Sequence, residues 1–252
     1  MYFNDVHILI YVVIAVAGFF IGKFVNWCNY SLPEYKKVFS KDIFKTRELD
    51  GYKPNLLLSL ITMFIYILLL YVLGIERTFL GNLELIKYLI LTPMLLSAFI
   101  IDYKLQIIPN RLNMTMFEIG IILMFLAGIF NANIAIDMFF GMVTGAGIFL
   151  TITLIGGLIA GKEAMGMGDV KLMGALGLYY GLQSIVVISV LAFLIGAIGS
   201  VIYMIINRKN ANAYIPFGPF IVVSSVITIF VPFTILFEIL METFTLGMYQ
   251  IH

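Results

Sequence analysis

The stretch Gly166-Met167-Gly168-Asp169-Val170-Lys171-Leu172-Met173-Gly174 lies between two long apolar runs, one ending near Ala160 and one resuming at Val170. An ionisable side chain at the edge of a membrane-spanning segment is costly to place, so Asp169 is a functional candidate. Gly166 and Gly168 bring no side chain, which allows a sharp turn and a close approach of backbone to backbone. The stretch becomes an active site only if a second group acts together with Asp169.

The composition indicates a polytopic membrane protein. Of 252 residues, 62% are hydrophobic and 12% are charged, against roughly 25% charged in soluble domains. A single cysteine, Cys28, excludes an internal disulfide and a multi-cysteine metal site. The net charge of +1 comes without a concentrated basic patch, so nucleic acid is not expected as a partner.

Hydropathy predicts an all-α fold of about eight transmembrane helices, because a span needs about 20 apolar residues. The N-terminus lacks a basic region and a cleavage site, so the first apolar run is interpreted as a retained span. Small residues at four-residue spacing, as in Gly141/Gly145 and Gly177/Gly181, predict close helix packing. The expected spans are 6–27, 55–74, 84–101, 112–130, 136–160, 170–181, 183–206 and 217–241.

Basic residues fall unevenly on the two sides that this span count predicts. Thirteen of the 15 Lys and Arg residues lie on alternate connections, and only Arg77 and Lys87 lie on the others. Connections rich in Lys and Arg stay in the cytoplasm, so we expect the N-terminus outside and the 28–54 loop inside. That loop is too short for an independent domain. We therefore expect one membrane domain over 1–252, with the loop lying on anionic lipid headgroups.

Asp102 is the candidate partner of Asp169. It ends the third expected span, and the chain crosses the membrane twice before it reaches Asp169, 67 positions later. Both aspartates are therefore expected at the cytoplasmic face. Glu118 lies about two turns into the fourth span, where it is expected to line a polar interior. The remaining acids near span ends fall on the outer side: Asp137, Glu238 and Glu242.

Two carboxylates held together at a partly desolvated site share a proton. The charged member then takes a proton from water while the protonated member polarises a carbonyl, which hydrolyses an amide without a covalent intermediate. A Ser/His/Asp set is not expected, because His7 and His252 lie towards the extracytoplasmic termini. Spacing alone leaves one alternative open, in which the two aspartates are interfacial acids held by Lys104 and Lys171.

Three sequence motifs resemble the type IV prepilin peptidases, which are GxGD membrane aspartic proteases. The first is the Gly166–Gly174 stretch together with Gly161-Lys162-Glu163-Ala164 before it, covering 161–174. The second, over 102–112, is Asp102 followed seven residues later by Pro109, then Asn110-Arg111-Leu112. The third is Ile215-Pro216-Phe217-Gly218-Pro219-Phe220, which is similar to the motif that opens the last span of bacterial members.

The resemblance implies that Asp102 and Asp169 are the catalytic residues, without a cofactor or metal ion. It implies a prepilin or pseudopilin substrate, whose short basic leader is removed at the cytoplasmic face of the inner membrane. Gly166 and Gly168 would let the catalytic loop move or pack beside the substrate. Lys104 and Lys171 would tune the pair of aspartates or bind lipid phosphate.

One part of the resemblance is missing. Many bacterial members carry two Cys-x-x-Cys pairs of zinc-site type in the first cytoplasmic loop, within a segment linked to N-methylation, whereas this chain has only Cys28. N-methylation of the product is therefore not expected. The alternatives are a preflagellin peptidase and a non-enzymatic transporter or secretion-complex subunit. The latter needs a polar path across the membrane, for which Glu118 is the only mid-span charge predicted.

Overall fold

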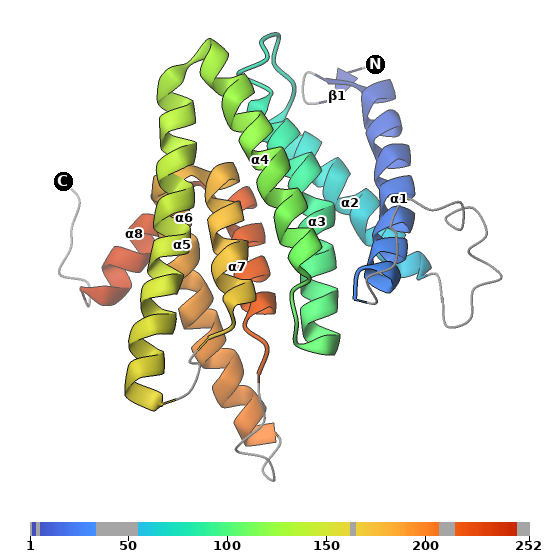
Figure 1. Cartoon of the computed structure of the whole chain (residues 1–252). Coiled ribbons are helices and arrows are strands. Elements are labelled where there is room, and N and C mark those ends of the chain that lie inside the picture. The colour runs from blue at the N-terminus through green and yellow to red at the C-terminus, as the bar shows by residue number, and fades with distance from the viewer. Residues whose placement is uncertain (1, 4–5, 34–54, 162–164, 207–214, 246–252) are drawn as a thin grey trace.

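The computed structural model describes residues 2–3, 6–33, 55–161, 165–206 and 215–245, and within these the fold is helical (Figure 1). The expected all-α class is confirmed. A short antiparallel pair, β1 (Tyr2–Phe3) and β2 (Val6–His7), precedes the first helix. The helices are α1 (Ile8–Ser31), α2 (Leu56–Leu73), α3 (Leu83–Leu105), α4 (Asn110–Phe130), α5 (Ala132–Ala160), α6 (Met167–Ile206), α7 (Gly218–Phe230) and α8 (Phe233–Phe244). Most of the 28–54 loop lies outside the described residues.

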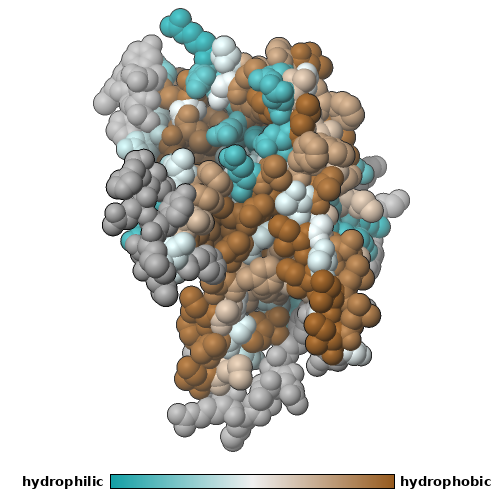
Figure 2. Space-filling model, turned by 90° about the vertical axis from the view of Figure 1, so that its left-hand side faces the viewer, coloured by the Kyte–Doolittle hydropathy of each residue, from teal (hydrophilic) through white to brown (hydrophobic). Residues whose placement is uncertain are grey.

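Among the described helices, α1 to α6 are long and apolar enough to cross a membrane. Their outer surfaces carry large apolar side chains, such as Ile129, Leu158 and Ile159, the last two more than 80% exposed. The face seen in Figure 2 is largely hydrophobic, with hydrophilic residues gathered near its upper end. Such a surface fits lipid rather than water, so the chain is a multi-pass membrane protein.

Helix α6 combines the two expected spans 170–181 and 183–206. Gly181 interrupts it with φ 75°, a left-handed conformation that glycine adopts without strain. The two halves, 167–180 and 182–206, run in opposite directions (Figure 1). Asp137 of α5 supports this turn, because its Oδ1 accepts a 3.1 Å hydrogen bond from the backbone N–H of Leu182.

The expected last span, 217–241, is not one helix. Helix α7 ends at Phe230, and α8 begins at Phe233 after Val231 adopts an extended conformation. Pro232 explains the break, because proline lacks a backbone N–H and disfavours helical geometry in the residue before it. The hydropathy of the segment is continuous, so the span prediction overlooked a local interruption.

Close glycine contacts hold the first half of α6 against α5. A Cβ added to Gly141 would collide with the carbonyl oxygen of Gly177, and one added to Gly177 would collide with the backbone of Gly141. The predicted small-residue packing is thus confirmed at this crossing. It presses the 167–180 segment, which carries Asp169 in its first turn, against a long neighbouring helix.

Lys87 was expected on an outer connection, but it lies inside α3 with only 7% of its surface exposed. Its Nζ donates a 2.8 Å hydrogen bond to the carbonyl oxygen of Tyr179, at the end of the first half of α6. A buried cation needs such a partner. Lys87 is thus a buried charge near the start of α3, although the charge count had placed it on a connection.

Candidate active site

The structure brings Asp102 and Asp169 together at one end of the helix bundle. Asp102 lies in the last turn of α3 and Asp169 in the first turn of α6. Their side chains are 4% and 5% exposed, and the two carboxyl groups are close enough to interact electrostatically. A buried pair of carboxyl groups is an unusual arrangement that favours one shared proton over two separate charges.

The chain turn after α3 shapes one wall of the site. Gln106 has φ 55° at the C-cap, and its N–H donates a 2.8 Å bond to the carbonyl oxygen of Asp102. Pro109, buried and extended, then caps the start of α4. Between them, the Ile108 side chain lies against both Gly168 and Gly218, within 3.3 Å of where a Cβ on either glycine would stand. Ile108 therefore fills the space between the two glycines.

The start of α7 contacts Asp102 directly. The backbone N–H of Gly218 donates a 2.9 Å hydrogen bond to Asp102 Oδ2. A Cβ on Gly218 would stand 2.5 Å from the same oxygen, so only glycine fits without displacing the carboxyl group. Sequence reasoning singled out the 215–220 motif without assigning Gly218 this role. The Gly-Pro pair that opens an apolar run was the available signal.

Three of the other predicted supporting residues lie within three positions of Asp169 in the chain, and Lys104 lies on α3. The carbonyl oxygen of Gly166 accepts a 3.0 Å bond from the N–H of Asp169. Gly168 packs against Ile108, with 3.3 Å between the Cβ of Ile108 and an added Cβ at 168. Lys171 is exposed, and its Nζ donates a 2.9 Å bond to Asn110 Oδ1. Lys104 is exposed on the last turn of α3.

Asn113 is a site residue that sequence reasoning missed. Its Nδ2 donates a 3.0 Å hydrogen bond to the carbonyl oxygen of Gly168, immediately before Asp169 in the chain. The side chain is 3% exposed, although asparagine is rarely buried. Its spacing, four residues after Pro109, would have placed it within the first turns of α4, but nothing in the sequence indicated its partner.

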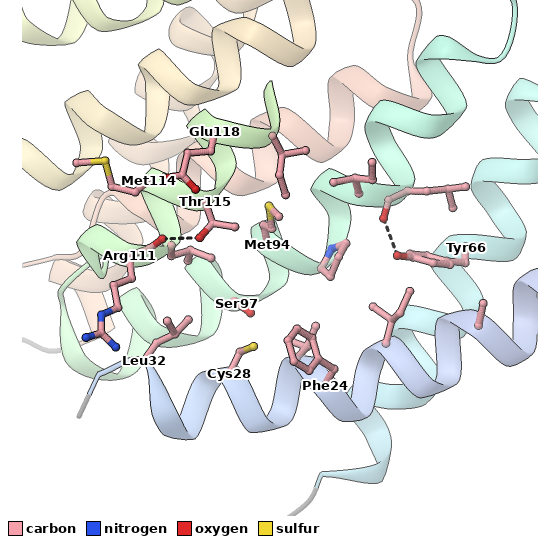
Figure 3. A pocket seen from close by; sticks show the side chains of 18 of the residues that line it. Phe24, Cys28, Leu32, Tyr66, Met94, Ser97, Arg111, Met114, Thr115 and Glu118 are labelled. Atoms are coloured by element: carbon pink, nitrogen blue, oxygen red, sulfur yellow. Dashed lines mark hydrogen bonds between the residues drawn. The ribbon is translucent and has the colours of Figure 1, made fainter. Parts of the chain in front are cut away.

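A groove of about 940 Å³ lies on another face of the α3–α4 pair, lined mainly by α1, α3 and α4 (Figure 3). Its lining is largely apolar and includes Phe24, Leu32 and Met94. Arg111 and Glu118 of α4 supply charged groups, so Glu118 lines this groove rather than a polar interior of the bundle. The two aspartates are not among the lining residues, and the groove is separate from the carboxyl pair.

Comparison with known proteins finds one family that part of the chain resembles. The model of the type IV leader peptidase family matches residues 89–201, a range that contains both aspartates and the residues joining them. Residues 89–201 are therefore similar to the type IV leader peptidase family. Within the described residues, no group of three His, Cys, Asp or Glu side chains is arranged to hold a metal ion.

Curated relatives carry the name prepilin leader peptidase/N-methyltransferase. The Legionella pneumophila protein is 33% identical over 139 residues, covering 54% of this chain and 46% of that protein. The Pseudomonas aeruginosa protein is 33% identical over 137 residues, with the same coverage. The Escherichia coli K12 protein is 28% identical over 134 residues, covering 53% of this chain and 58% of that protein. The matches thus span about half of each relative, and no solved structure matches significantly.

Proposed function

We propose that the chain is an aspartic endopeptidase that removes the leader peptide from type IV prepilin or prepilin-like proteins. The observation that carries the proposal is the pair of buried carboxyl groups, Asp102 and Asp169, close enough to interact at one end of the bundle. The family match over 89–201 and the prepilin peptidase names of the relatives supply the substrate class.

The chemistry is hydrolysis of a peptide bond by two carboxyl groups that share one proton. The ionised carboxylate takes a proton from a water molecule, and the water oxygen forms a bond to the scissile carbonyl carbon. The protonated carboxyl group donates its proton towards the carbonyl oxygen, which stabilises the tetrahedral intermediate. As the C–N bond breaks, the carboxyl group that took the proton from water passes it to the leaving nitrogen, and the other carboxylate recovers its proton from a hydroxyl of the intermediate. The products are a carboxylic acid and an amine, and the pair again holds one proton.

The contact from α7 suggests how the two aspartates divide these roles. The Gly218 N–H belongs to the first turn of α7 and points at Asp102 Oδ2. A helix N-terminus carries partial positive charge and favours an anion beside it. Asp102 is thus the member of the pair best placed to carry the negative charge and activate water, and Asp169 is the member that donates a proton to the substrate carbonyl.

We place this site at the cytoplasmic face of the inner membrane. The support is the uneven distribution of Lys and Arg, 13 of 15 on the connections that share a side with the aspartates when the spans alternate. Lys104, Arg111 and Lys171 lie at the same end of the bundle as the two aspartates. A basic leader emerging from an apolar helix of the substrate would meet the carboxyl pair at this level of the bilayer.

Mass spectrometry of a co-expressed prepilin tests the proposal. The pilin isolated from cells with the wild-type protein should have lost its leader, and the mass of its new N-terminus also reports any methylation. Persistence of the full-length prepilin, with the membrane protein folded and present, would contradict the proposed function. Cleavage without added methyl groups is the expected result, since only Cys28 is present.

A further inference from the structure

The first turns of α4 and α6 are joined by two asparagine side chains. Asn113 Nδ2 donates a 3.0 Å hydrogen bond to the carbonyl oxygen of Gly168. Asn110 Oδ1, three residues earlier and on the same side of α4, accepts a 2.9 Å bond from Lys171 Nζ. We call Asn110 and Asn113, with these two bonds, the asparagine clamp.

The two hydrogen bonds of the asparagine clamp attach to the chain on both sides of Asp169. Gly168 precedes the aspartate directly, and Lys171 follows it by two residues. Helix α4 is in turn joined to α3, the helix of Asp102, by the short connection that ends at Pro109. The clamp therefore connects the two segments that carry the carboxyl groups. A shift of α4 relative to α6 would change the distance between the aspartates.

The burial of Asn113 indicates that the hydrogen bond to Gly168 is the reason for an asparagine at this position. Its Oδ1 is buried and has no hydrogen-bond partner among the described residues. Buried polar atoms are nearly always satisfied, and an unpaired one costs stability. An apolar side chain of the same shape would avoid this cost. Proteins retain such locally unfavourable residues mainly where function needs them.

We propose that Asn113, assisted by Asn110, is a positioning residue that sets the place of Asp169 relative to Asp102. The inference rests on the proposed peptidase function. Asn113 acts through the Gly168 carbonyl and does not touch the substrate. Loss of its donor group frees Gly168 to turn, and a displacement of about 1 Å at a catalytic group lowers turnover by up to ~100-fold.

The test compares Asn113→Leu with Thr92→Val. Leucine keeps the shape of asparagine and removes the bond between helices. Thr92 is also buried, but its hydroxyl donates to Tyr88 within α3, so valine removes only an intrahelical bond. For each purified variant, kcat and KM on a prepilin substrate are measured per folded protein. Hydrogen exchange of the peptide over 165–173 reports the clamp without reference to activity.

Asn113→Leu should lower kcat at least tenfold, leave KM within about threefold and accelerate exchange over 165–173, while Thr92→Val resembles the wild type. If Asn113→Leu does not fold, Asn110→Ala, which removes only the exposed bond to Lys171, should still lower kcat severalfold and accelerate the same exchange. Unchanged kcat and exchange in the folded variants would overturn the inference. A wild-type protein that cleaves no prepilin would contradict the proposed function instead. Hydrogen exchange over 165–173 would then show by itself whether the clamp holds this segment.

Discussion

Adding one carbon at Gly218 is expected to disable the site without disturbing the rest of the bundle. In Gly218→Ala the new Cβ would stand 2.5 Å from Asp102 Oδ2 and 3.0 Å from its Cγ, with Ile108 Cδ1 3.2 Å away on another side. Ordinary contacts of a Cβ begin at 3.4 Å. Because α3 and α7 are both packed helices, we expect the Asp102 carboxyl group to shift rather than the backbone of either helix.

The size of the effect follows from this geometry. Restoring an ordinary contact moves the Asp102 carboxyl group by about 1 Å and disturbs its hydrogen bond from the Gly218 N–H. A misplacement of about 1 Å at a catalytic group costs up to ~100-fold in rate, which corresponds to about 2.7 kcal/mol of activation free energy. The thermal stability should change less than the cleavage rate, because the shift is confined to one side chain and its hydrogen bond from Gly218.

Cleavage rates of a prepilin substrate, normalised to folded protein in detergent, provide the assay. Gly147→Ala is the matched control, since a Cβ there meets no atom within 4 Å. Gly168→Ala should be intermediate, because its Cβ would be 3.3 Å from Ile108 and needs only a small shift. If Gly218→Ala cleaves at the rate of Gly147→Ala, the close contact with Asp102 has no part in catalysis and the geometric reasoning is refuted.

Three further outcomes are expected. Gly177→Ala should lower stability in a detergent unfolding assay by about 1–3 kcal/mol, because the methyl group collides with the Gly141 backbone; an unchanged midpoint would contradict this packing. Lys87→Met should cost about 1–3 kcal/mol in the same assay, since the Tyr179 carbonyl loses its buried donor; equal stability would show that the bond is dispensable. With Cys28 replaced, a cysteine at position 104 should be labelled only from the cytoplasm and one at position 133 only from outside; labelling of both from one side would refute the proposed topology.

The sequence was most informative where local chemistry determines structure. Apolar runs of about 20 residues predicted the helices, and glycine spacing predicted the α5–α6 contact. Pro232 was present as a signal for the break between α7 and α8, but a hydropathy window averages over one residue. Lys87 was misplaced because charge was interpreted as a mark of an extramembrane connection, whereas the Tyr179 carbonyl allows it to be buried.

The same distinction between local patterns and long-range contacts applies to the candidate site. Asp102 and Asp169 could be paired by counting membrane crossings, since that count fixes their depth and side. Their supporting contacts depend on how distant helices pack. Gly218 reaches Asp102 across 116 positions, and Asn113 reaches Gly168 across 55. Neither contact follows from a local pattern, because each is set by the crossing of two helices whose relative placement the sequence does not reveal.

The most direct test of the central claim is the cleavage rate of Asp102→Asn and Asp169→Asn on a prepilin substrate, measured per folded protein. An amide can neither share the proton nor activate water, so both variants should insert normally and show no cleavage above background. Asp137→Asn is the control, because it lies at the opposite end of the bundle and asparagine keeps an oxygen for the Leu182 N–H. Normal cleavage by either aspartate variant would contradict the two-carboxylate mechanism.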